Sequence, residues 1–215
     1  QTEEAGLSSA IKKQDIEDLI EVGELITEHE AAALIKQEKI KNGIQKSTEY
    51  TALLSDSIRK HAAAIDKWLA EITVCDPAVG SGAFPVGMMN EIVRARNVLS
   101  VFLNDQKRND YEFKRRCIEH SLYGVDIDPG AVEIAKLRLW LSLVVDEEDI
   151  KNIKPLPNLD YKIVCGNSLL GVERDLLNDH LFKDLEKLKP LYFNETNPTK
   201  KQAYRKQIDD LISQI

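Results

Sequence analysis

The feature that most constrains this chain is a glycine-bearing loop between a predicted strand and a predicted helix. Residues 72–84, ITVCDPAVGSGAF, begin with a β-branched run, pass through small turn-forming residues and end where a helical pattern starts. Such a loop lets backbone N–H groups approach a ligand at the carboxyl edge of a parallel sheet. The alternative is an ordinary tight turn, in which glycine and serine are common. The strand-to-helix context favours a ligand loop.

The spacing within this loop disfavours a dinucleotide cofactor. The dinucleotide fingerprint is G-x-G-x-x-G/A, whereas Gly80 and Gly82 are followed by Pro85 at the third position. The first acidic residue at a predicted strand end is Asp126, in YGVDIDP, and a carboxylate there offers two oxygens to the cis hydroxyls of a ribose. Asp126 is therefore predicted as a ribose ligand, with a solvated loop acid as the alternative. Asp128 is predicted to cap the next helix.

Strands and helices alternate after this loop, which predicts an α/β fold with a parallel sheet. We expect strands near the loop and over residues 122–125 and 161–165, but only about three in all. The apolar spacing over residues 9–72 predicts two or three helices before the sheet. Further helices are expected over 83–102, 111–119, from Pro129 onward, and over the charged stretch 172–215, interrupted near Pro198. We expect core packing from Leu137, Leu139, Trp140, Leu141 and Leu143.

Composition narrows the class of protein. No apolar run in the 215 residues approaches the roughly 18 residues of a membrane span, and the first residues lack the pattern of a secretory signal. The chain begins at Gln1, which suggests a piece of a longer protein. The three cysteines and four histidines have neither disulfide-framework nor metal-ligand spacing, which favours a reducing cytoplasm and no metal site. The net charge of -7 argues against a strong phosphate-backbone binder.

Three motifs in this order, DPAVGSGAF, YGVDIDP and GNSLL after a hydrophobic strand, resemble motifs I, II and III of S-adenosylmethionine-dependent DNA methyltransferases that modify adenine at N6. The resemblance is closest to the large methylases of type IIG or type IIS restriction-modification enzymes and related phage-exclusion systems. It implies a partial, Rossmann-like methyltransferase sheet with an N-terminal helical segment. The implied division is a helical segment over 1–70, a cofactor-binding α/β core over 71–171, and a charged helical insertion or linker over 172–215.

The resemblance also implies particular cofactor contacts. It places Asp126 on the ribose of S-adenosylmethionine, in agreement with the physical argument, and Ile127 against the adenine ring. Asn167, followed by Ser168, stands where many members carry an aspartate that accepts from the adenine amine. The alternative is that Asn167 and Ser168 only cap the following helix. Around the methionine moiety the resemblance places Asp76, Ala78, Gly80 and Gly82.

The catalytic motif of the family is missing from this chain. That motif is Asn or Asp followed by Pro-Pro and an aromatic residue, whereas Asn197-Pro198 is followed by threonine and lysine. We interpret this Asn-Pro as a turn between two charged helices. The chain alone is therefore expected to contain no catalytic residue and to be inactive.

The expected function is the S-adenosylmethionine-binding part of a site-specific adenine-N6 DNA methyltransferase of a bacterial, cytoplasmic restriction-modification system. Double-stranded DNA would be contacted through parts of the parent protein outside this chain, and a fused nuclease is compatible with the family. One alternative is a methyltransferase that acts on RNA, protein or a small molecule, since cofactor motifs do not name the acceptor. The other is a non-enzymatic helical interaction module in which the sheet is only a scaffold.

Overall fold

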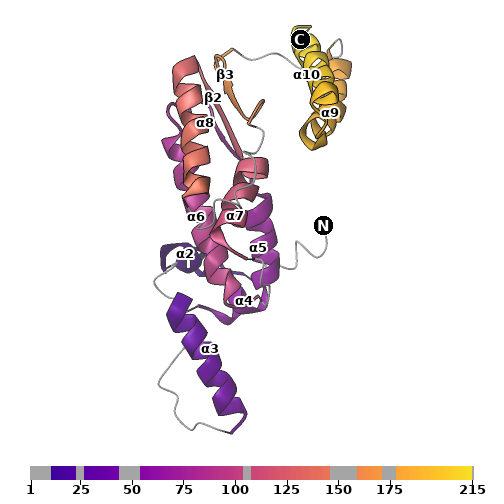
Figure 1. The fold of residues 1–215 in the computed structure, drawn as a ribbon. Helices are drawn as coiled ribbons and strands as arrows, with labels where there is room; N and C mark the ends of the chain where they lie inside the picture. The colour runs from indigo at the N-terminus through magenta and orange to yellow at the C-terminus, as the bar shows by residue number, and fades with distance from the viewer. Residues whose placement is uncertain are drawn as a thin grey trace. The chain divides into compact units, whose positions relative to one another are not determined.

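The computed structural model describes residues 11–22, 27–43, 54–103, 108–145, 159–170 and 178–214. The chain divides into two compact units, Gln1–Gly166 and Asn167–Ile215. Figure 1 shows the sheet and the helices that pack on it in the first unit, and a pair of helices in the second. Among the described residues, no helix is long and apolar enough to cross a membrane.

The first unit contains a three-stranded parallel sheet in the order β1-β2-β3. The strands are β1 (Val74–Asp76), β2 (Leu122–Asp126) and β3 (Ile163–Cys165). Asp76 pairs with Gly124 and Asp126 pairs with Cys165, so the carboxyl ends of all three strands lie at one edge. This arrangement confirms the predicted α/β class. β3 begins two residues later than expected, because Tyr161 adopts a turn conformation with a φ of 61°.

Helices of the first unit build its main core against the sheet. They are α6 (Ala83–Ser100), α7 (Asp110–Arg116), the π-helix η2 (Cys117–Ser121) and α8 (Pro129–Val144). Polar caps start two of them: the Asn109 side chain accepts from Glu112 N at 2.8 Å, and the Asp128 side chain accepts from Gly130 N at 2.8 Å. The prediction of Asp128 as the cap of α8 is thereby confirmed. The buried side chains of this core include Val79, Met89, Ile92, Ile118, Leu122, Val132, Leu139 and Ile163.

The exposed face of α8 corrects one prediction. Leu139 and Leu143 are buried as expected, but Leu137 and Leu141 are 51% and 48% exposed, and Trp140 is exposed as well. The reason is that the helix is apolar almost all round. At 100° per residue, positions 139 and 143 face the core together with 132 and 135, while positions 137 and 141 turn away from it.

The N-terminal part contains four described helices, where the sequence predicted two or three. These are α2 (Lys13–Val22), α3 (Thr27–Lys41), α4 (Asp56–Lys60) and α5 (Ala62–Glu71). α4 and α5 are separate because His61, with φ -110° and ψ 15°, interrupts one apolar stretch. A second core joins α2, α4 and α5 to α6 through Leu19, Leu54, Ile58, Ala62, Ile65, Val98 and Leu99.

A buried ionic cluster also connects α5 to the sheet-bearing part. The Asp66 carboxylate accepts from Arg96 Nε at 2.8 Å and from both terminal nitrogens of Arg108, at 2.9 and 2.7 Å. Both guanidinium groups lie over the Phe113 ring, with centroid distances of 4.2 and 4.8 Å. The cluster therefore joins the N-terminal helices to α6 and α7 by directional contacts in addition to apolar packing.

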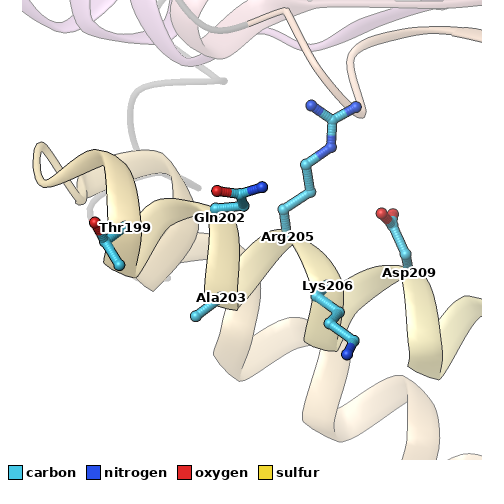
Figure 2. Close-up of a pocket in the computed structure, with 6 residues that line it drawn as sticks. All are labelled: Thr199, Gln202, Ala203, Arg205, Lys206 and Asp209. Carbon is cyan, nitrogen blue, oxygen red and sulfur yellow. The ribbon is translucent and has the colours of Figure 1, made fainter.

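The described part of the second unit contains two helices, α9 (Asp179–Asn194) and α10 (Pro198–Ile212), which pack against each other. Asn197 caps α10, because its Oδ1 accepts from Thr199 N at 3.0 Å and from Lys200 N at 3.2 Å. This geometry confirms the interpretation of Asn197-Pro198 as a turn between helices. Figure 2 shows a shallow hollow on α10, in which Arg205 and Lys206 point away from each other.

Candidate functional site

The glycine loop follows β1 directly and is fastened to the end of β2. Asp76 Oδ1 accepts from Ala78 N at 3.0 Å, which turns the chain immediately after the strand. Val79 N donates to Val125 O at 2.9 Å, and Gly82 N donates to Val79 O at 2.9 Å. The structure thus brings Asp76, Ala78 and the two glycines to the end of β2, beside Asp126.

Asp126 uses both carboxylate oxygens to hold the backbone around it. Oδ2 accepts from Gly80 N at 2.8 Å, and Oδ1 accepts from Asp128 N at 2.9 Å. The Asp128 N–H, followed by that of Gly80, lowers the pKa of Asp126 below its ordinary value, so the group is ionised at neutral pH. Each oxygen has a second lone pair, so each can still accept one ligand hydroxyl. The sequence predicted a ligand role for Asp126 but gave no sign that it also tethers the loop.

The two loop glycines are required for different physical reasons. Gly82 has a φ of +81°, and a Cβ there would lie 3.0 Å from Cα and Cβ of Ala135 on α8. Gly80 has a φ of +49°, and a Cβ there would meet nothing within 4 Å. At Gly82 the lack of a side chain allows the loop to pack on α8, a role that the sequence analysis did not foresee. Contact of the two glycines with a ligand remains a prediction.

The start of α6 presents unused hydrogen-bond donors. Val86 N donates to Gly82 O, and Pro85 has no N–H. Among the described residues, no acceptor is recorded for the backbone N–H groups of Ser81, Ala83 and Phe84. Donors at a helix N-terminus favour an anionic acceptor such as a carboxylate. The donor set therefore fits the amino-acid end of S-adenosylmethionine.

Two further residues extend the candidate site. Ile127 follows β2 directly and is 71% exposed, so its side chain is available to pack against a flat ring. Arg138 on α8 donates from Nη1 to Ser81 Oγ at 3.2 Å, a contact that the sequence analysis missed. The only sequence signal for it is helical spacing, because Arg138 lies one turn after Ala135, which packs under the loop.

Asn167 and Ser168 belong to the second unit and are exposed. Asn167 Oδ1 accepts from Leu169 N at 3.0 Å, so its amide oxygen already turns the backbone after β3. The helix that these residues were alternatively expected to cap would fall on residues 171–177, which lie outside the described part. Their contact with the adenine ring remains a prediction. In the part of the chain that is described, no group of three His, Cys, Asp or Glu side chains could hold a metal ion.

Comparison with known proteins supports a restriction-modification methyltransferase. Residues 120–215 match the Eco57I restriction-modification methylase family, a match that includes β2, α8, β3 and the helices of the second unit. Over 146 residues the chain is 42% identical to a protein of Methanocaldococcus jannaschii named as a candidate type II restriction enzyme and methyltransferase. That alignment covers 64% of this chain and 12% of the relative, so the chain spans only a small part of the relative's length. No solved structure matches the chain.

These similarities agree with the fold. The parallel sheet, the glycine loop and the strand-end acid are compatible with part of a Rossmann-like methyltransferase, and both comparisons support a methyltransferase fragment of a restriction-modification system. The relative is archaeal, so the bacterial source implied by the resemblance stays an expectation.

Proposed function

We propose that this chain is the S-adenosylmethionine-binding part of a DNA methyltransferase that modifies adenine at N6. The observation that carries the proposal is the Asp126 carboxylate, which is bonded to Gly80 N at 2.8 Å and retains acceptor capacity beside the unused donors of α6. A diol acceptor and anion donors at one sheet edge match the ribose and methionine ends of this cofactor.

The roles of the site residues follow from their chemistry. Asp126 binds the ribose hydroxyls, and Ile127 packs on the adenine ring. The N–H groups at the start of α6 bind the methionine carboxylate, while Asp76 and Ala78 fix the loop that carries those groups. Asn167 and Ser168 complete the adenine contacts from the end of β3. The bound cofactor supplies an electrophilic methyl group, and these residues hold and orient it.

The acceptor and the division of the chain belong to the same proposal. Residues 71–171 form the cofactor core, 1–70 a helical segment, and 172–215 an insertion or linker that precedes the catalytic motif. The 215 residues contain no Asn-Pro-Pro or Asp-Pro-Pro sequence, so the group that contacts the adenine amine is supplied from outside them. Duplex DNA is likewise bound by other parts of the cytoplasmic parent protein, with the target base turned out of the helix for methylation.

Two experiments test the proposal. Calorimetric titration of the chain with S-adenosylhomocysteine and with NAD should show binding of the first ligand alone. Failure to bind any adenosine-containing ligand would favour the helical interaction module instead. For the acceptor, DNA from cells that express the complete protein should contain N6-methyladenine at a specific sequence. Methylation of RNA or protein without methylated DNA would favour the other methyltransferase class.

A further inference from the structure

Arg138 contacts the glycine loop from outside the three sequence motifs. Its Nη1 donates to Ser81 Oγ at 3.2 Å, across 57 residues of sequence. One turn earlier on α8, Ala135 lies against the position where a Cβ of residue 82 would be. α8 therefore touches the loop at two successive turns, once by packing and once by a charged donor.

The glycine loop has two supports, one from the strand-end acid Asp126 and one from α8. Asp126 accepts from the N–H groups of Gly80, within the loop, and of Asp128, the residue that caps α8. Ser81 lies on the other side of Gly80, next to the unused N–H groups that begin α6. A change at Arg138 therefore removes the support at Ser81, nearest the start of α6, and leaves the bonds of Asp126 to Gly80 and Asp128 in place.

We propose that Arg138 is a positioning residue for the amino-acid end of the cofactor. Through Ser81 it holds the donors at the start of α6 in place, and its positive charge favours a carboxylate there. This inference rests on the proposed function, because it assigns Arg138 a part in the same site. One hydrogen bond at an exposed position has a limited effect, so its loss should weaken binding about threefold to tenfold.

Two ligands separate this role from a general effect on folding. S-adenosylhomocysteine carries the amino-acid end, whereas 5′-methylthioadenosine carries the same adenosine without it. Calorimetry on the full chain should show that Arg138→Ala weakens the binding of S-adenosylhomocysteine about threefold to tenfold and leaves the binding of 5′-methylthioadenosine unchanged. Arg138→Lys should recover part of the loss, because an ammonium group can also donate to the Ser81 hydroxyl.

The route through Ser81 is tested by a double-mutant cycle. Ser81→Ala should weaken the binding of S-adenosylhomocysteine. In the double variant the fold-loss of affinity should be smaller than the product of the fold-losses in the two single variants. The matched control is Lys136→Gln, which removes a positive charge from the same helix; Lys136 Nζ is bonded to Glu133 Oε1 at 2.8 Å, not to the loop. This control should bind both ligands like the wild type.

Three results would overturn the inference. If Arg138→Ala lost affinity equally for both ligands, its effect would be a general one on the sheet edge. If it lost no affinity for either ligand, Arg138 would have no role in binding. Independent losses from Ser81 and Arg138 would exclude action through the hydroxyl. If the wild type bound neither ligand, the proposed cofactor would fail and this inference with it, an outcome distinct from unaltered binding in the Arg138 variants alone.

Discussion

Gly80 N donates to Asp126 Oδ2 at 2.8 Å, although the two residues are 46 positions apart. This bond joins the loop after β1 to the end of β2. The proposed ribose ligand and the loop that holds the methionine end are consequently set by a single carboxylate. Substitution of that carboxylate should affect both parts of the site.

Asp126→Asn should weaken the binding of S-adenosylhomocysteine by more than about tenfold, because the amide removes the charge and turns one acceptor into a donor facing a backbone N–H. Asp128→Ala should keep the ligand affinity and lower the stability of the chain by about 1 kcal/mol through loss of the α8 cap. Calorimetry and thermal denaturation measure the two effects. Equal affinities for the two variants would contradict the assignment of Asp126.

The two loop glycines should respond differently to alanine. Gly82→Ala places a Cβ against Ala135 at a φ of +81° and should lower the free energy of unfolding by about 1 to 3 kcal/mol. Gly80→Ala enters open space, so only the strain of its φ of +49° remains; it should cost about 1 to 2 kcal/mol while weakening ligand binding. Urea denaturation beside ligand titration would distinguish the positions. A Gly80 variant that binds normally would show that its open side does not face the ligand.

The Asp66 cluster predicts sensitivity to acid. Burial raises the pKa of Asp66, but hydrogen bonds from Arg108 and Arg96 outweigh it and hold the pKa at about 2. The folded pKa lies below the unfolded value, so this stabilisation is present at neutral pH and is lost as the pH falls from about 4 to about 2. Asp66→Asn should lower the free energy of unfolding at pH 7 by an amount on the order of 3 kcal/mol. It should also remove the loss of stability between about pH 4 and about pH 2. Lys136→Gln, at an exposed pair, should change stability by less than about 0.5 kcal/mol.

Lys162 predicts a second rise of stability with pH, in the alkaline range. Burial lowers the pKa of its ammonium group to about 8, although the negative charge of Glu119 acts in the opposite direction and raises it. Nζ lies 4.2 Å from the Tyr123 ring centroid, and no hydrogen-bond acceptor for it is found among the described residues. Between pH 8 and 10.5 the unfolded chain holds the proton more tightly, so stability should rise with pH. Lys162→Met should abolish this rise and be neutral or stabilising at pH 7; a clear loss of stability at pH 7 would contradict the assignment.

Duplex DNA should bind this chain only weakly and with a shallow salt dependence. The net charge is -7, and the basic run of α10 is divided: Lys201 lies over the Tyr192 ring at 5.4 Å, while Arg205 and Lys206 point apart in Figure 2. Few phosphates can then be neutralised together, so few counterions are released. Fluorescence anisotropy at several salt concentrations tests this. Nanomolar, sequence-selective binding would place DNA recognition within these residues.

Local signals explain what the sequence could predict. The order of strands and helices and the caps at Asp128 and Asn197 depend on neighbouring residues, and these predictions were confirmed. The packing of Gly82 on Ala135 and the exposed side of α8 depend on tertiary contacts that hydrophobic periodicity does not specify. The contact between Arg138 and Ser81 was missed for the same reason, since a charged residue on a helix is most often solvated.

The Asp66 cluster has a consequence for how the chain can be shortened. A recombinant fragment that began at β1 would retain Arg96 and Arg108 against Phe113 but lack the carboxylate that both guanidinium groups share. The two guanidinium groups would then lie beside the same ring without their shared counter-ion, and the packing of α5 residues Ala62 and Ile65 on α6 would be lost as well, so the fragment should be less stable. A minimal fragment for ligand screening or crystallisation must therefore start before Ala62 and keep α5, even though every proposed cofactor contact lies after it.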